Sequence, residues 1–116
     1  MSEIRPGQVY WLAFGPVAGS APAARHPCVV VQNDVFNRSA IATSVVCLIT
    51  SNLSRPKAPC NVLLKKGEAN LGKASVVNVS QILTVDKAEL AECVGKLSGV
   101  AAEAVRDGLH MIFDRL

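Results

Sequence analysis

The 116-residue sequence predicts a mainly β domain, a small β-barrel with one amphipathic helix appended at its C-terminal end. Two observations favour this fold class. Short apolar runs rich in β-branched residues recur along residues 8–97, and Pro, Gly and polar turn residues separate them. After residue 98, apolar residues recur at spacings of three, four and seven, as one face of a helix requires. Residues 1–116 are long enough for a single core, so one domain is expected.

Each expected strand is bounded by turn signals. The first, residues 8–14, follows a Pro-Gly turn, and the second, residues 27–32, begins at a proline. The remaining strands are expected at residues 43–50, 60–65, 74–79 and 93–97. Residues 80–85 are expected to continue, after a break, into a further strand or a short helical turn.

The connections and helices follow from capping and turn residues. Residues 15–24 are small and rich in Pro and Gly, so a mobile loop is expected there, and residues 51–59 should form a second exposed loop. Asn33 or Asp34 is expected to cap a turn or short helix within residues 33–39. Residues 86–90 should form one helical turn, and Ser98 should cap the C-terminal helix. The apolar face of that helix comprises Ala101, Ala104, Val105, Leu109, Ile112, Phe113 and Leu116.

Composition and charge limit the class of protein. Half of the residues are apolar and 18% are charged, which is typical of a globular chain. No run approaches the ~20 apolar residues of a membrane span, and no secretory signal is visible, so a cytoplasmic location is expected. The net charge of +3 is uneven: residues 4–73 carry +6 and residues 74–116 carry −2. The basic portion suits a polyanion such as nucleic acid or an acidic protein, and a solvated surface of uneven sign explains it equally well.

Four cysteines are scattered along the chain, at Cys28, Cys47, Cys60 and Cys93. None belongs to a C-x-x-C pair, and two lie inside apolar runs. We therefore expect buried thiols rather than a metal or redox site.

A basic pair, Arg25 and His26, precedes the second expected strand. Pro27 fixes its own φ and favours an extended His26, and the valines that follow indicate a strand covered on both faces. Charged groups at the mouth of a rigid strand are typical of a binding or catalytic site.

Six motifs occur in an order that matches a known family. They are Gly7–Trp11, Gly19–Ser20, Arg25–Asp34, Ile49–Asn52, Ser75–Ile82 and Thr84–Lys87. Over nearly its whole length the sequence resembles the MazF/PemK toxins of bacterial toxin–antitoxin modules. The resemblance implies an SH3-like barrel that works as a homodimer. It also implies a ribosome-independent endoribonuclease that needs no metal or cofactor and cuts single-stranded RNA at a short motif. An acidic, MazE-like antitoxin protein that occupies the RNA groove is the implied partner.

The resemblance also implies site residues. Arg25 and Thr50 correspond to the family's main catalytic candidates. Three departures stand out, because the family usually has Arg directly before the proline, Glu in the loop and Arg after the Gln-Ile pair. Here these positions hold His26, Ala21 and Leu83. The residues expected to bind substrate are Gly19, Ser20, Pro27, Ser51, Asn52, Asn78 and Gln81.

RNA cleavage of this kind needs no enzyme nucleophile, because the RNA 2′-hydroxyl attacks the adjacent phosphate. The protein supplies a proton acceptor, a cation and a proton donor. Arg25 offers a planar, charged fork for phosphate, although the residue alone indicates a solvated loop arginine. His26 suits acid or base chemistry and equally suits a backbone hydrogen bond before proline. The Thr50 hydroxyl suits donation to a phosphate oxygen.

Two other functions fit the same barrel. A toxin that binds DNA gyrase, as the CcdB toxins do, needs no catalytic residues, and Arg25, His26 and Thr50 argue against it. An inactive nucleic-acid binder is the second alternative, because Ala21 removes a carboxylate that would otherwise serve as a base.

Overall fold

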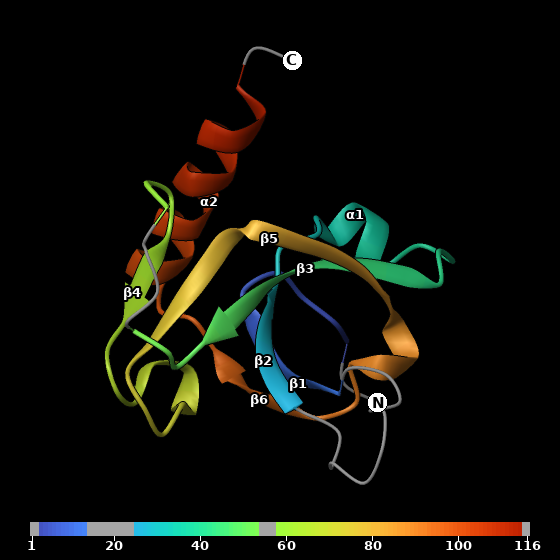
Figure 1. Cartoon of the computed structure of the whole chain (residues 1–116). Coiled ribbons are helices and arrows are strands. Elements are labelled where there is room, and N and C mark those ends of the chain that lie inside the picture. Colours follow the sequence, from blue (N-terminus) through green and yellow to red (C-terminus); the bar gives the residue numbers. More distant parts are fainter. Residues whose placement is uncertain (1–2, 14–24, 54–57, 115–116) are drawn as a thin grey trace, which may run out of the picture.

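A computed structural model describes residues 3–13, 25–53 and 58–114. In this part of the chain six strands form one antiparallel sheet with the order β4-β5-β3-β2-β1-β6, which curls into a half-barrel with α2 packed on its outside (Figure 1). The elements are β1 (Gln8–Ala13), β2 (Arg25–Val30), α1 (Asp34–Asn37), β3 (Thr43–Thr50), β4 (Val62–Leu64), η1 (Glu68–Asn70), β5 (Ser75–Asp86), η2 (Lys87–Glu89), β6 (Cys93–Lys96) and α2 (Gly99–Phe113). The predicted fold class, a mainly β barrel with a C-terminal helix, is confirmed.

Several strand boundaries differ from the sequence prediction, and β2 ends at Val30 rather than at residue 32. β2 begins at Arg25 rather than at residue 27, because Ala13 and Leu12 extend the β1–β2 pairing to Arg25 and His26. β4 is shorter than predicted, with only Val62–Leu64 paired to β5. The expected break after residue 79 is wrong, because β5 continues without interruption to Asp86.

An irregularity in β5 explains the apparent break. Leu48 of β3 pairs with Asn78, whereas the preceding Cys47 pairs with Ile82. Residues 79–81 therefore form a bulge, which bends the strand and leaves the polar residues Ser80 and Gln81 exposed.

Two clusters of buried apolar residues lie on opposite faces of the sheet. One contains Val9, Val29, Cys47 and Val77, and α2 packs against it. The other contains Tyr10, Leu12, Cys28, Val30, Val46, Val85 and Leu90. Strand alternation produces this division, because successive side chains of a strand point to opposite faces.

The gap between edge strands β4 and β6 is bridged by η1. The Asn70 side-chain amide donates to the Val94 carbonyl at 3.0 Å. The Gly95 backbone lies against Ala69, where an added Cβ would be 2.5 Å from the Ala69 carbonyl oxygen. This contact covers the edge of β6 without a seventh strand.

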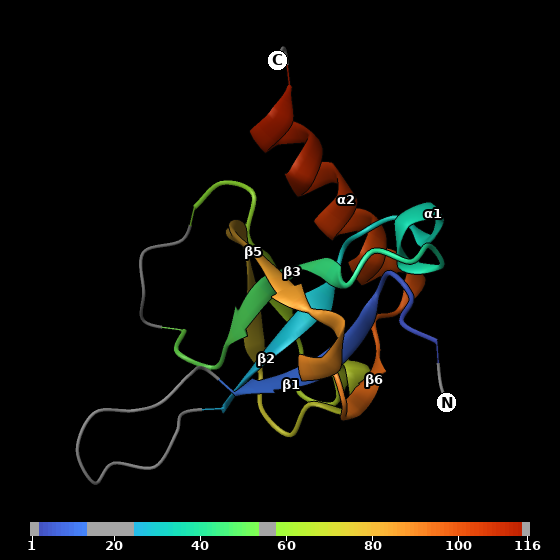
Figure 2. The same ribbon diagram turned by 90° about the vertical axis from the view of Figure 1, so that its right-hand side faces the viewer.

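Helix α2 begins as predicted. The Ser98 Oγ accepts from the Ala101 N–H at 3.2 Å, and the Glu68 carboxylate accepts from the Ser98 N–H at 2.7 Å. The first half of the predicted apolar face is buried at Ala101 and Val105. The last turns project away from the barrel (Figure 2) and leave Phe113 54% exposed. Among the described residues, no helix has the length and apolar character needed to cross a membrane.

Candidate functional site

A cavity of about 510 Å³ lies where β1, β2 and β3 meet at one end of the sheet. It is lined by six of the predicted site residues, Arg25, His26, Pro27, Thr50, Ser51 and Asn52. Trp11, Ile49, residues 71–73 and Ser75 complete its wall. Gly19 and Ser20, with Ala21 beside them, lie outside the described residues, as does the loop expected at residues 15–24.

Arg25 and His26 project to opposite faces of the sheet. His26 pairs with Leu12, and Arg25 pairs with Ala13, so alternation turns their side chains apart. Cys28 pairs with Leu48. His26 and Thr50 lie two residues beyond that pair on their strands, so their side chains emerge on one common face. Of the basic pair before Pro27, His26 is therefore the residue that shares a face with Thr50.

Arg25 is held by two contacts. Its guanidinium carbon lies 5.3 Å from the centre of the Trp11 ring, and its Nη2 donates to the Glu92 carboxylate at 3.0 Å. Both groups of the ion pair are more than half exposed, so the pair itself adds little stability. The Trp11 ring orients the guanidinium at the cavity wall, where an incoming phosphate can replace Glu92.

Thr50 closes β3 and starts a tight turn. Its Oγ1 accepts from the Asn52 N–H at 3.1 Å. This contact engages the hydroxyl oxygen as an acceptor, and the hydroxyl retains a hydrogen that it can donate.

The predicted substrate-binding residues Asn78 and Gln81 do not line this cavity. They lie farther along β5, where the Asn78 Nδ2 donates to the Gln81 Oε1 at 3.0 Å. Asn78 belongs to the face of the sheet that carries Thr50, because Asn78 pairs with Leu48 and Val76 pairs with Thr50. Gln81 lies beside Asn78 through their hydrogen bond.

Sequence reasoning missed Glu92 and Lys73 as neighbours of the site. Glu92 is 67 residues from Arg25 in the chain, so no local pattern could have linked them. Lys73 lies in the turn before β5 and adds a cation to the cavity wall. Trp11 lines the cavity, and its ring lies beneath the Arg25 guanidinium.

The prediction of buried thiols is confirmed for Cys28 and Cys47 and wrong for Cys93, which is exposed. Burial raises the pKa of the Cys28 thiol to about 12 and that of Cys47 to about 11. Both are therefore protonated at neutral pH and unsuited to attack as thiolates. Within residues 3–13, 25–53 and 58–114, no group of three or more His, Cys, Asp or Glu residues could hold a metal ion.

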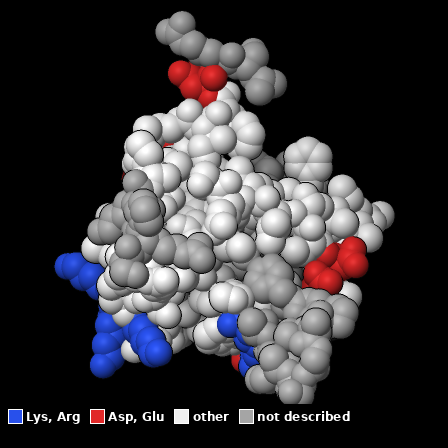
Figure 3. All heavy atoms as spheres, in the orientation of Figure 1, with Lys and Arg blue, Asp and Glu red and all other residues white. Residues whose placement is uncertain are grey.

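Charge is distributed unevenly over the surface. Lys and Arg side chains gather at the end of the molecule that carries η1, whereas the area between α1 and α2 is almost free of charge (Figure 3). The lysines of the turns flanking this end are Lys65, Lys66 and Lys73, all exposed. Such a surface attracts polyanions toward the neighbouring cavity.

Comparison with known proteins gives a consistent result. A family model described as PemK-like, MazF-like toxin of type II toxin–antitoxin system matches residues 5–113. The chain is 38% identical over 111 residues to endoribonuclease MazF6 of Mycobacterium tuberculosis, covering 96% of this chain and 97% of that protein. It is 35% identical over 115 residues to endoribonuclease MazF of Staphylococcus saprophyticus, covering 94% and 95%.

Solved structures share the fold. An endoribonuclease in complex with its cognate antitoxin from a mycobacterial species superposes with a TM-score of 0.77 at 22% identity, covering 97% of this chain and 96% of that chain. A MazE–MazF complex from Deinococcus radiodurans gives a TM-score of 0.76 at 23% identity, with the same coverage of both chains.

Proposed function

Because this chain belongs to the PemK-like, MazF-like toxin family of type II toxin–antitoxin systems, we propose that its sheet-end cavity is the active site of an endoribonuclease toxin. Its relatives over nearly their full length are endoribonucleases, which favours RNA cleavage over binding to DNA gyrase. The observation that carries the proposal is that Arg25, His26 and Thr50 all line one cavity, with Arg25 on one face of the sheet and the other two on the opposite face. We propose that the enzyme acts in the cytoplasm.

The proposed reaction uses the RNA's own 2′-hydroxyl. His26 accepts the proton of the 2′-hydroxyl as its oxygen bonds to the neighbouring phosphorus. The bond from phosphorus to the 5′-oxygen breaks, and the imidazolium returns the proton to that oxygen. The products are a 2′,3′-cyclic phosphate and a free 5′-hydroxyl.

Thr50 and Arg25 stabilise the charge that develops on the phosphorane. The Thr50 hydroxyl donates to one phosphate oxygen, and its oxygen is already fixed by the Asn52 N–H. We propose that the Arg25 guanidinium, which lies over the Trp11 ring, contacts the same phosphate from its own side of the cavity. All the groups needed are side chains, so the reaction is expected to proceed without a metal ion.

Cleavage of a long RNA in EDTA tests this proposal. Purified protein is expected to cut at one short motif and to leave 2′,3′-cyclic phosphate ends, which end mapping detects. Arg25→Ala protein, purified in parallel, should cut at least about tenfold more slowly, because it loses a charge-assisted phosphate contact. Intact RNA, or equal rates for the two proteins, would contradict the assignment.

We further propose that an acidic antitoxin, similar to MazE, blocks the same cavity. Two solved relatives are complexes with an antitoxin. The exposed lysines near η1 and the Arg25 guanidinium supply the positive charge that such a segment requires. An acidic side chain at Arg25 would compete directly with the RNA phosphate.

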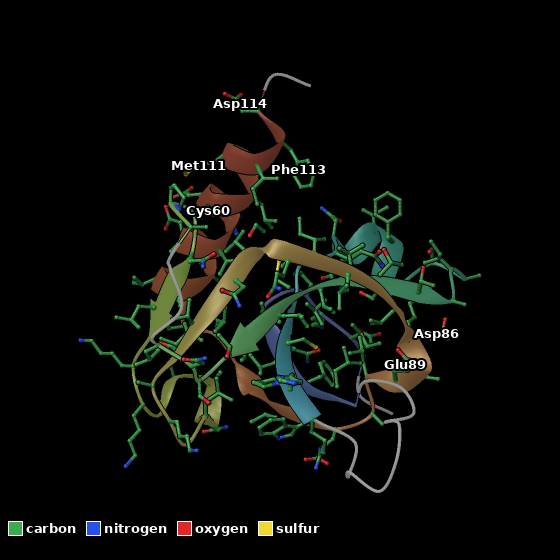
Figure 4. The ribbon with its side chains drawn as sticks, viewed as in Figure 1. Cys60, Asp86, Glu89, Met111, Phe113 and Asp114 are labelled. Carbon is green, nitrogen blue, oxygen red and sulfur yellow. The ribbon has the colours of Figure 1, made fainter. Side chains whose placement is uncertain are left out.

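A second copy of the chain is the proposed partner of the uncharged area between α1 and α2. An apolar hollow of about 480 Å³ lies there, lined by Val31, Phe36, Ile82, Leu109 and Phe113 among others. The Phe36 and Phe113 side chains are each 54% exposed. Phe113 lies on the side of α2 that faces α1, and Met111 lies on the other side (Figure 4). Exposed apolar patches of this kind mark interfaces between proteins.

Phe113→Glu is expected to convert the dimer to a monomer, because it places a carboxylate in the apolar interface. Light scattering coupled to gel filtration measures the mass. Met111→Glu is the matched control, since Met111 is 61% exposed on the opposite side of the same helix, and it should remain dimeric. Equal masses for the two variants would place the interface elsewhere.

A further inference from the structure

Three side-chain amides form a chain of hydrogen bonds at the bulge of β5. The Asn61 Oδ1 accepts from the Val79 backbone N–H at 3.1 Å. The Asn61 Nδ2 donates to the Asn78 Oδ1 at 3.0 Å. The Asn78 Nδ2 in turn donates to the Gln81 Oε1 at 3.0 Å. Asn61 directly precedes β4, so the polar row connects the start of β4 with β5.

The Val79 backbone N–H fixes the orientation of every amide in this row of hydrogen bonds. A backbone N–H can only donate, so the Val79 amide requires the oxygen of Asn61 to face it. Asn61 must then present its NH₂ group to Asn78, and Asn78 must present its own to Gln81. Each amide has one oxygen side and one nitrogen side, so no member of the chain can rotate alone without losing a hydrogen bond.

The last group of this hydrogen-bonded row, the Gln81 NH₂ group, is consequently a hydrogen-bond donor. The Gln81 oxygen is engaged by Asn78, which leaves the Gln81 NH₂ group directed away from the chain. Gln81 is exposed, and no partner for its Nε2 is found among the described residues. The bulge over residues 79–81 holds Gln81 beside Asn78, as bulges near functional sites commonly re-aim a side chain.

The row lies next to the proposed cleavage site. Asn78 pairs with Leu48, and two residues along the same pair of strands Val76 pairs with Thr50. The Asn78 and Thr50 side chains therefore lie on the same face of the sheet, two residues apart along the paired strands. A nucleotide next to the phosphate held at Thr50 would extend its base over this row.

We propose that the Gln81 NH₂ group reads the keto oxygen of one base next to the cut, selecting uracil or guanine over cytosine or adenine. Asn61 is the positioning residue that sets this preference without contacting RNA. The inference rests on the proposed endoribonuclease function. The physical basis is that an NH₂ group held in place donates a hydrogen bond to the keto oxygen of a base. An amino group at the same position of a base would face this donor without a hydrogen bond.

Two substitutions should reverse the preference. In Asn61→Asp, a carboxylate oxygen still accepts from Val79, but the second oxygen can no longer donate. Asn78 and then Gln81 must turn over, which presents the Gln81 oxygen to the base. Gln81→Glu presents an acceptor directly. Both are expected to change the base preference at one motif position from U or G to C or A by about tenfold, while the other motif positions stay the same.

Sequencing of cleaved ends from a randomised RNA pool measures the preference within each variant. Ser80→Asp is the charge control, because it adds a carboxylate to the same bulge without joining the amide chain, and its motif should match that of the wild type. Gln81 is exposed, so Gln81→Glu should fold even where Asn61→Asp does not.

A wild-type motif with no U or G position would overturn the inference, and so would an unchanged motif in Gln81→Glu. A failure of the proposed function is distinct, because wild-type protein would then leave the RNA pool intact before any variant is compared.

Discussion

His26→Ala is expected to lower the rate of RNA cleavage by about 10²–10⁴-fold, the usual contribution of a group that transfers a proton in the transition state. His26 lines the sheet-end cavity, and strand alternation places it on the face of the Thr50 hydroxyl. Single-turnover cleavage of an oligonucleotide that contains the motif measures the effect. Binding of the same oligonucleotide with a 2′-deoxy sugar at the cut should change little, because the phosphate contacts of Arg25 remain.

His26→Arg separates proton transfer from charge stabilisation. It restores the arginine that the family usually carries before the proline, so it should keep more activity than His26→Ala through charge stabilisation alone. A His26→Ala rate within threefold of the wild type, with unchanged folding by circular dichroism, would show that the proton acceptor is another group.

Gly95→Ala is expected to lower the free energy of unfolding by about 1–3 kcal/mol, as overpacking of a tight contact does. The new Cβ would lie 2.5 Å from the Ala69 carbonyl oxygen and 2.8 Å from the Ala69 carbonyl carbon. These are backbone atoms of η1, which cannot turn away as a flexible side chain could. The contact between η1 and β6 must open, and urea denaturation reports the loss.

Gly99→Ala is the matched control for Gly95→Ala. Gly99 begins α2, and an added Cβ there meets nothing within 4 Å. Because alanine has the higher helix propensity, this variant should be as stable as the wild type or slightly more stable. Equal stability of the two variants would mean that η1 yields freely and does not hold the edge of β6.

Local signals explain which elements could be predicted from the sequence. β3 occupies the predicted residues 43–50. Asn33, one of the two residues predicted to cap α1, and Ser98, the predicted cap of α2, each accept a backbone hydrogen bond. Such signals depend on neighbouring residues alone. The bulge in β5 depends on pairing with β3, which lies more than thirty residues earlier. The residues of β5 taken alone therefore indicate an interruption of the strand.

The candidate site was only partly predictable for the same reason. In the sequence, Arg25 and His26 form one basic pair before the second expected strand. Their strand begins two residues earlier than predicted, and alternation then turns the two side chains apart. Asn61 and Glu92 join their partners across 17 and 67 residues, distances over which no spacing rule operates.

Gln81 ends the amide row at the bulge of β5. The next residue, Ile82, lines the apolar hollow between α1 and α2. Any rearrangement of these consecutive residues therefore changes both the amide row and the apolar hollow. If assembly of two chains favours one arrangement of the bulge, RNA that needs the same arrangement binds the assembled form more tightly. Thermodynamic reciprocity then requires that RNA strengthen the assembly by the same factor. Subunit exchange measured with and without uncleavable RNA would give this coupling free energy.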